Sequence, residues 1–274
     1  MSIESKVLGQ QVAYPTDYCP SILVPVPRSL NREIYDIHTP EELFLGFDTW
    51  HAYEAGFLAR NGLPVCGVLK LVYPANSPCI VESKSLKLYL NSLNMTRLGE
   101  DIPSGIETYL QTVKSDLEQI LQTCVEATFF RQAPEKTYFD FQDYTLLEAI
   151  PGIERETFTE YNENPALLEN RTTGRGEIKV CSHLLRSNCK ITKQPDWGSI
   201  YIHIQADCLP DHASLLKYIV SLRNENHFHE EICEMTYKRL RYPVSTPVVG
   251  ASTSVPPGPT KRNTSQNTSK PRKH

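Results

Sequence analysis

The chain has 274 residues, of which 40% are hydrophobic and 22% are charged, and its formal net charge is −4. This composition is typical of a globular protein with one large domain or two modules, and it excludes a fibrous or wholly disordered chain. No apolar run approaches the ~20 residues that a membrane-spanning helix needs, and the N-terminus lacks a basic-then-apolar signal pattern. We therefore expect a cytoplasmic protein with no membrane partner.

The charge is distributed unevenly along the chain. Six basic residues and no acidic ones lie from Arg241 onward, which leaves 22 basic against 32 acidic residues in residues 1–240. Because neutralising phosphates requires clustered Lys and Arg, this acidic body argues against nucleic acid as the main partner.

The first half of the chain is predicted to form an arm and a module. Prolines at positions 20, 25, 27 and 40 interrupt the aromatic-rich residues 1–60, which indicates an extended arm. Residues 61–135 then show strand and helix periodicities in turn, as a first module. Its predicted elements are strands over 63–73 and 79–81, helices over 85–93 and 106–121, and a strand over 124–130. Residues 136–176 show few periodic signals and form the predicted connection.

A second module is predicted over residues 177–242. It has strands over 178–183 and 198–204, a helix over 211–223 with Asp211 as its N-cap, and a helix over 226–240. The two halves share the order strand, strand, helix, helix, and the helical segments from Ser85 and from Ser214 match at five positions in register. Antiparallel strands with helices on one face predict an α+β fold.

The last segment differs from the rest. Residues 243–274 are rich in Pro, Ser and Thr, carry no acidic residue and show no periodicity. This composition predicts a disordered basic tail. The second module would then be incomplete and lack its final strands.

Cys189 is the first candidate for chemistry. It lies in a polar loop between two predicted strands, with Lys190 and Lys193 nearby, and positive neighbours stabilise the nucleophilic thiolate. Asp196 follows beside Trp197, and a carboxyl held against an indole ring would favour its protonated form and act as a general acid. The alternative, from residue types alone, is an ordinary loop cysteine and a turn-forming aspartate.

His229 and Glu230 open the last predicted helix, away from its apolar face, where they could point toward a ligand. The alternative is that acidic residues here simply favour the helix dipole. In the first module, Glu82 at a strand end could accept paired N–H donors from a planar base, and Lys84 on the following helix could bind phosphate. The alternative there is a solvated helix face.

The cysteines also suggest a competing metal site. Cys181, His183, Cys189 and Cys208 are candidates, but their spacing does not form paired C-x-x-C knuckles. The eight cysteines are scattered through mixed apolar sequence, which predicts reduced thiols. We therefore predict no metal.

These strings together resemble the long, two-module form of the NADPH-dependent 7-cyano-7-deazaguanine reductases, from residue 8 to about residue 240. The supporting strings are Pro25-Val26-Pro27-Arg28, GFDTWHAYE from Gly46, ESKSLKLYLNS from Glu82, LLRSNC from Leu184, QPDWGS from Gln194, and Phe228-His229-Glu230-Glu231. The resemblance implies two tandem tunnelling-fold modules, each with four antiparallel strands and two helices. It also implies a homodimer.

The resemblance implies an activity and a role for each residue. The family reduces the nitrile of 7-cyano-7-deazaguanine to 7-aminomethyl-7-deazaguanine in queuosine biosynthesis. Cys189 would attack the nitrile carbon to form a thioimide, and Asp196 would donate the proton. The deazaguanine would be held by Val81, Glu82, Ser83, His229 and Glu230, and NADPH would be contacted by Ser83 and Lys84. Reduction to an amine takes four electrons, hence two NADPH, and a covalent intermediate retains the half-reduced substrate.

The resemblance ends near residue 240. Family members continue with an Arg-Arg-Gly-Gly stretch that contacts NADPH and with an Asp-Ile-Asn-Pro stretch, and neither string follows Arg241 here. Two alternatives therefore stay open. One is a zinc-dependent tunnelling-fold enzyme acting on a pterin or purine, and the other is a base-binding protein that has lost catalysis.

Overall fold

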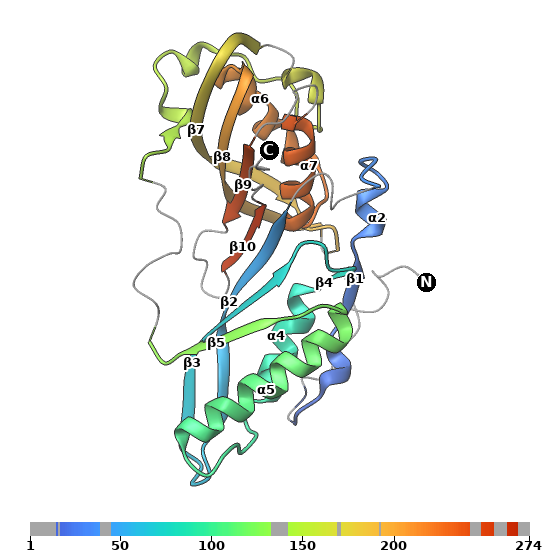
Figure 1. Cartoon of the computed structure of the whole chain (residues 1–274), viewed down its shortest axis with the longest axis vertical. Coiled ribbons are helices and arrows are strands. Elements are labelled where there is room, and N and C mark those ends of the chain that lie inside the picture. Colours follow the sequence, from blue (N-terminus) through green and yellow to red (C-terminus); the bar gives the residue numbers. More distant parts are fainter. Residues whose placement is uncertain are drawn as a thin grey trace, which may run out of the picture. The chain divides into compact units, whose positions relative to one another are not determined.

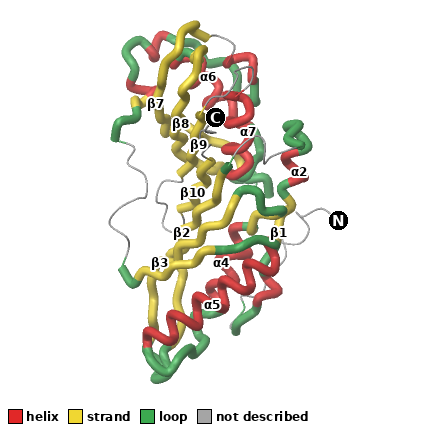
Figure 2. Tube along the Cα trace, in the orientation of Figure 1, coloured by secondary structure: helices red, strands yellow, loops and turns green. Residues whose placement is uncertain are grey.

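A computed structural model describes most of the chain (Figures 1 and 2). The described residues are Pro15 and residues 17–38, 45–132, 142–168, 171–191, 193–241, 248–254 and 262–267, the last two segments by their backbone alone. The chain divides into two compact units. Unit 1 is formed mainly by residues 1–38 and 47–137, and unit 2 mainly by residues 138–256.

Unit 1 is built on three antiparallel strands in the order β2–β3–β5. These strands are β2 (Gly46–Leu58), β3 (Pro64–Pro74) and β5 (Glu126–Phe130). Helices α4 (Ser83–Ser92) and α5 (Ile102–Leu121) contribute the other side of the core. The fully buried residues of α5 recur every four positions, at Tyr109, Val113, Leu117 and Leu121. This spacing places them on one helical face, as the sequence predicts.

A two-stranded ribbon positions the start of α4. Strand β1 (Pro25–Pro27) pairs with β4 (Cys79–Val81), and the backbone N–H of Glu82 donates to the carbonyl oxygen of Val24 at 2.9 Å. The short elements beside this ribbon are η1 (Pro20–Ile22) and α2 (Ser29–Arg32). Arg28 fixes the ribbon to the sheet, because its guanidinium forms an ion pair with Asp48 of β2. Both side chains are only 4% exposed.

Unit 2 repeats this plan with longer strands. The hairpin of β7 (Arg171–Asn188) and β8 (Pro195–Pro210) is extended by β9 (Val248–Ser254) and β10 (Arg262–Asn267), all antiparallel to their neighbours. Helices α6 (His212–Ser221) and α7 (His229–Arg241) lie beside the sheet (Figure 1). The Asp211 carboxylate accepts a hydrogen bond from the Ser214 N–H at 2.8 Å, which confirms the predicted N-cap. The remaining short elements are β6 (Thr145–Leu146), parallel to β7, and the 3₁₀ turns η2 (Leu147–Ala149), η3 (Ile153–Arg155), η4 (Pro165–Leu168) and η5 (Leu222–Asn224).

The two units share one topology. In each, two long strands form a hairpin, two helices follow, and the next strand pairs with the second strand of the hairpin. The orders are β2–β3–β5 and β7–β8–β9. The predicted α+β class and the repeated order of strands and helices are confirmed.

Strands of the structure lie within two segments that the sequence predicts to lie outside the modules. The predicted arm over residues 1–60 contains β2, a sheet strand of unit 1 that pairs with β3 on both sides of a register shift between Ala52 and Ala55. The tail contains β9 and β10, so the second module does not lack later strands. Strand pairing satisfies backbone N–H and C=O groups and needs no apolar side chains. Both tail strands are free of proline, and the prolines at 256, 257 and 259 fall between them.

Five helices occur in the described parts of the chain, and none is both long and apolar enough to cross a membrane. The longest, α5, has 20 residues. Four charged residues interrupt it, at Glu107, Lys114, Asp116 and Glu118.

Breaking the buried ion pair of unit 1 is expected to destabilise the protein. Asp48→Ala leaves the Arg28 guanidinium buried without its carboxylate, which should lower the free energy of unfolding by about 3–5 kcal/mol. The control is Glu100→Ala, which breaks the exposed pair with Arg60 and should cost no more than about 1 kcal/mol. Urea unfolding measures both, and equal effects would contradict the anchoring role of Asp48.

Candidate active site

Cys189 directly follows the last residue of β7 and begins the turn into β8. Its N–H donates to the Gln194 carbonyl oxygen at 2.7 Å, and its carbonyl oxygen accepts from the Lys193 N–H at 2.9 Å. Lys193 adopts a left-handed backbone with φ 57°, which closes the turn. The Cys189 thiol is half-buried and is not in a disulfide with any cysteine of the described ranges. The backbone therefore fixes this cysteine more firmly than the polar loop predicted from the sequence.

The turn is joined to the segment that begins α7. The Asn188 N–H donates to the Glu225 carbonyl oxygen at 2.8 Å, and the His227 N–H donates to the Asn188 carbonyl oxygen at 3.1 Å. A side-chain link adds to these bonds, because the Lys190 ammonium lies 3.0 Å from Oε1 of Glu231. Residues more than 35 positions apart in sequence thus meet beside the cysteine.

Glu231 is the centre of this contact. Its carboxylate is 8% exposed and also accepts from the Phe228 N–H at 3.2 Å, while its Oε2 lies 3.3 Å from Nδ1 of His227. The other ring nitrogen of His227 lies 3.6 Å from a Glu225 carboxylate oxygen. Glu231 therefore links the first turn of α7 to Lys190 and to His227, and His227 in turn lies near Glu225.

Asp196 and His229 belong to the same part of unit 2. Asp196 lies on β8, directly opposite Ser187 of β7. Burial lowers the pKa of His229, and the nearby Asp196 carboxylate opposes this effect. Nε2 of His229 is buried and has no hydrogen-bond partner among the described residues. Glu230, the next residue of α7, is also buried.

The surroundings of Trp197 give no support to the predicted packing of Asp196 against it. Neighbouring residues of a strand point to opposite faces, so the two side chains diverge. Trp197 is 46% exposed, and its ring lies 6.0 Å from the Arg186 guanidinium and 5.3 Å from that of Arg223. The Asp196 carboxylate acts on His229, whose pKa it raises against the effect of burial.

The second predicted group lies in unit 1, where β4 ends and α4 begins. Glu82 is the N-cap of α4, and its two carboxylate oxygens accept from the N–H groups of Lys84 at 3.0 Å and Ser85 at 2.6 Å. Val81 and Glu82 are buried, Ser83 is half-buried and Lys84 is exposed. Each carboxylate oxygen keeps further acceptor capacity, so the cap orients Glu82 without exhausting it.

The register of β7 against β8 separates the candidate metal ligands. Cys181 lies opposite Tyr201, whereas Cys208 lies opposite Thr173. Cys189 is at the turn, eight residues beyond Cys181, which at strand spacing is roughly 25 Å. In the described ranges, no three His, Cys, Asp or Glu side chains gather as a metal site.

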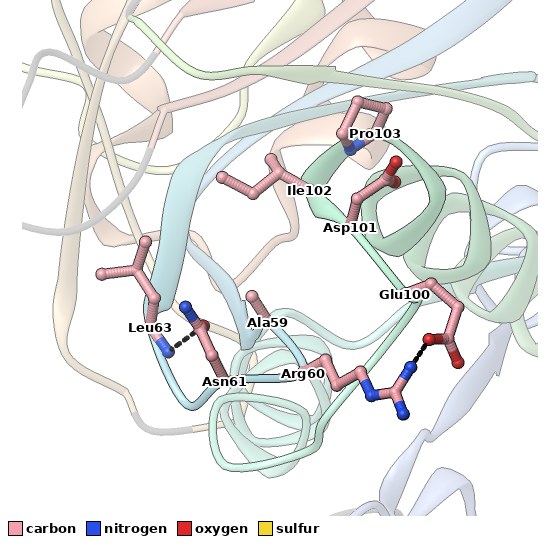
Figure 3. Close-up of a pocket in the computed structure, with 8 residues that line it drawn as sticks. All are labelled: Ala59, Arg60, Asn61, Leu63, Glu100, Asp101, Ile102 and Pro103. Atoms are coloured by element: carbon pink, nitrogen blue, oxygen red, sulfur yellow. Dashed lines mark hydrogen bonds and ion pairs between the residues drawn. The ribbon is translucent and has the colours of Figure 1, made fainter.

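A surface cavity of about 720 Å³ lies elsewhere, at the β2–β3 turn and the start of α5 (Figure 3). Its rim carries the Arg60–Glu100 ion pair, and both of these side chains are largely exposed. The Asp101 carboxylate there caps α5 through the Ser104 N–H at 2.9 Å. None of the predicted site residues lines this cavity.

Sequence reasoning missed Ser187 and Glu231. Ser187 precedes the candidate nucleophile by two positions, so strand alternation was the available signal. Glu231 follows His227 by four positions, which places the two on one face of a helical turn. Neither signal shows that Ser187 lies opposite Asp196 or that Glu231 pairs with Lys190.

Cys189 at the β7–β8 turn, Asp196 at the start of β8 and the buried His229 at the start of α7 belong to segments that backbone hydrogen bonds join. Residues 14–129 match the family model described as nitrile reductase, 7-cyano-7-deazaguanine-reductase N-term. A relative from Acinetobacter baumannii (strain ACICU) is 37% identical over 238 residues, 86% of this chain and 83% of the relative. A relative from Coxiella burnetii (strain Dugway 5J108-111) is 38% identical over 232 residues, which are 84% of this chain and 80% of the relative. Both bear the name NADPH-dependent 7-cyano-7-deazaguanine reductase, and the chain belongs to this family.

Replacing Glu231 is expected to loosen the junction between the cysteine turn and α7. Glu231→Gln keeps one carbonyl acceptor but removes the charge that faces Lys190 and His227, and should cost about 1–3 kcal/mol of unfolding free energy. The matched control is Glu156→Gln, which breaks the more exposed pair with Lys217 and should cost at most about 1 kcal/mol. Urea titrations compare the two variants, and a smaller loss for Glu231→Gln would argue against the junction.

Proposed function

We propose that this chain reduces the nitrile of 7-cyano-7-deazaguanine to a primary amine, as an NADPH-dependent oxidoreductase of queuosine biosynthesis. The observation that supports it most directly is Cys189, held at the β7–β8 turn in the same part of unit 2 as Asp196, His229 and Glu230. Relatives covering most of the chain carry the name of this activity.

The first step is thiol addition to the nitrile. The thiol first loses its proton to water, and the Cys189 thiolate sulfur then forms a bond to the nitrile carbon while one carbon–nitrogen π bond breaks. Its electron pair goes to the nitrogen, which takes a proton from Asp196 to complete a thioimide. NADPH, when bound, supplies the two hydrides that reduction to the amine requires. The C–S bond breaks between the two reductions, so Cys189 is regenerated.

The deazaguanine presents a planar edge of N–H donors, which calls for carboxylate acceptors. Glu230 is buried at the start of α7, and Glu82 is oriented by the N-terminus of α4. Nε2 of His229, which lacks a partner among the described residues, offers one more polar contact for a bound base. We propose that these residues, with Val81 and Ser83, hold the substrate.

NADPH requires donors for its phosphates, and the start of α4 is suited to them. Ser83 is the first residue of this helix, and the exposed Lys84 is the second. A helix N-terminus and an ammonium group both favour a phosphate. We propose that Ser83 and Lys84 contact the cofactor.

The assembly expected for this function is a homodimer of chains with two tandem tunnelling-fold modules, in the cytoplasm. The shared topology of the two units supports two modules in one chain. Strand β9 supports a more complete second module than the sequence predicts, because it pairs with β8 over seven residues.

The decisive test is NADPH oxidation with and without 7-cyano-7-deazaguanine. Oxidation should depend on the nitrile and consume two NADPH for each amine formed. Substrate binding without oxidation would instead favour a base-binding protein, and loss of turnover on chelation would favour the zinc enzyme.

Cys189→Ala should abolish turnover and the covalent adduct, since no other residue at this turn offers a thiol. Intact-mass spectrometry should show one added substrate on the native chain. The control is Cys208→Ala, which removes a half-buried thiol at the far end of the same hairpin and should leave the adduct intact. An adduct that persists in Cys189→Ala would move the nucleophile elsewhere.

Asp196→Asn should keep substrate binding but slow thioimide formation, because the amide preserves the shape of the side chain and lacks an acidic proton. General acid catalysis is typically worth ~10²–10⁴ in rate. Single-turnover kinetics would measure the adduct rate and calorimetry the affinity. An unchanged rate would exclude Asp196 as the acid.

A further inference from the structure

Ser187 occupies a special place in the β7–β8 hairpin. It lies directly opposite Asp196 in the strand register and two positions before Cys189. Residues two apart on a strand share a face, as do residues directly opposite each other. Strand geometry thus places the serine side chain on the face that carries the acid, two residues before the cysteine that begins the turn.

The exposure of neighbouring residues agrees with this placement. Leu185 and Ser187 are buried, whereas Arg186 between them is partly exposed and faces Trp197 across the outer side of the hairpin. On β8, Asp196 is less exposed than Trp197, its neighbour. The hairpin therefore turns Ser187 and Asp196 toward the interior of unit 2.

The hydroxyl of Ser187 has no hydrogen-bond partner among the described residues, although the residue is 0% exposed. Burying an unsatisfied polar group costs free energy, and such groups are few in folded proteins. Packing alone would be served equally well by alanine. An unpartnered, fully buried hydroxyl next to an acid points to a ligand that supplies the missing bond.

A second unpartnered atom supports the same conclusion. Nε2 of His229 is also buried without a partner in the described part of the chain, and His229 lies close enough to Asp196 for the two charges to interact. Two unsatisfied groups, one on β7 opposite the acid and one on α7 whose pKa responds to it, therefore belong to this part of unit 2. A molecule that bonds to Asp196 would satisfy both.

We propose that Ser187 is a further catalytic residue, whose hydroxyl donates a hydrogen bond to the nitrile nitrogen while Cys189 adds to the nitrile carbon. This inference rests on the proposed function. As the C–S bond forms, an electron pair moves from the carbon–nitrogen π bond to the nitrogen, which gains negative charge before the Asp196 proton arrives. Ser187 keeps its own proton and stabilises that charge.

The nitrogen is the atom within reach of this hydroxyl. Side chains directly opposite on an antiparallel pair have Cβ atoms ~4.5–5.5 Å apart. A nitrogen that accepts a hydrogen bond from Asp196 therefore lies close enough to accept one from Ser187. The pair would act as the donors of an oxyanion hole do, with nitrogen in place of oxygen.

The test compares Ser187→Ala with Thr236→Val. Thr236 is a matched control because its hydroxyl is also fully buried and has no partner among the described residues. It lies on α7, about two helical turns beyond His229. Adduct formation with 7-cyano-7-deazaguanine, without NADPH, is followed by rapid quenching and intact-mass spectrometry. Calorimetry on the Cys189→Ala background measures affinity, and urea midpoints measure stability.

We expect Ser187→Ala to slow adduct formation by ~10²–10³, the loss typical of one such donor. Substrate affinity should change by less than about tenfold, and the urea midpoint should stay level or rise, because an unsatisfied hydroxyl has been removed. Thr236→Val should shift only the midpoint. A role in folding alone would lower the midpoint and leave the adduct rate at saturating substrate unchanged.

The outcomes separate this inference from the function on which it rests. If the native chain forms no adduct at Cys189, the proposed function fails, and the role of Ser187 fails with it. If the native chain forms the adduct and Ser187→Ala forms it equally fast, only the role of Ser187 is overturned. A loss confined to affinity would also overturn it, because a transition-state donor must change the rate.

Discussion

The register of β7 against β8 is the constraint on which the candidate site depends. It sets Ser187 opposite Asp196 and leaves Cys189 at the first position of the turn. A slip of one residue would carry each side chain of one strand to the other face. The acid would then point outward and Trp197 inward, and the hydroxyl would lose its place opposite the acid. Arg186 and Trp197, paired on the outer face, help to fix this register.

A second set of contacts joins the β7–β8 turn to the start of α7. Asn188 exchanges backbone hydrogen bonds with Glu225 and His227, and Lys190 pairs with Glu231. These bonds hold the start of α7 beside the turn, so the imidazole of His229 comes from a different element than the thiol and the acid. Polar groups are concentrated here at some cost in stability, because the Ser187 and His229 atoms that lack partners among the described residues gain nothing until a ligand arrives.

The two units show how one topology can carry different chemistry. Each has a hairpin, two helices and a strand returning to the hairpin. In unit 1, the helix start after β4 carries Glu82, whose carboxylate is oriented by the N–H groups of α4. In unit 2, the candidate catalytic residues lie at the hairpin turn and on β8, and His229 and Glu230 lie at the start of α7. The repeated helices need matching core faces only, which leaves the strand ends and helix starts free to diverge.

The sequence by itself determined the features that depend on local spacing. The apolar face of α5, the Asp211 cap and the strand over Pro64–Pro74 all follow from residues within a few positions of one another. The strings around Cys189 and Asp196 also identified the family. Only the tertiary structure decided that Trp197 is exposed, that β9 pairs with β8, and that Ser187 is buried with no partner in the described ranges. These facts depend on partners distant in sequence, because pairing and burial are properties of the assembled sheet and helices that no local pattern records.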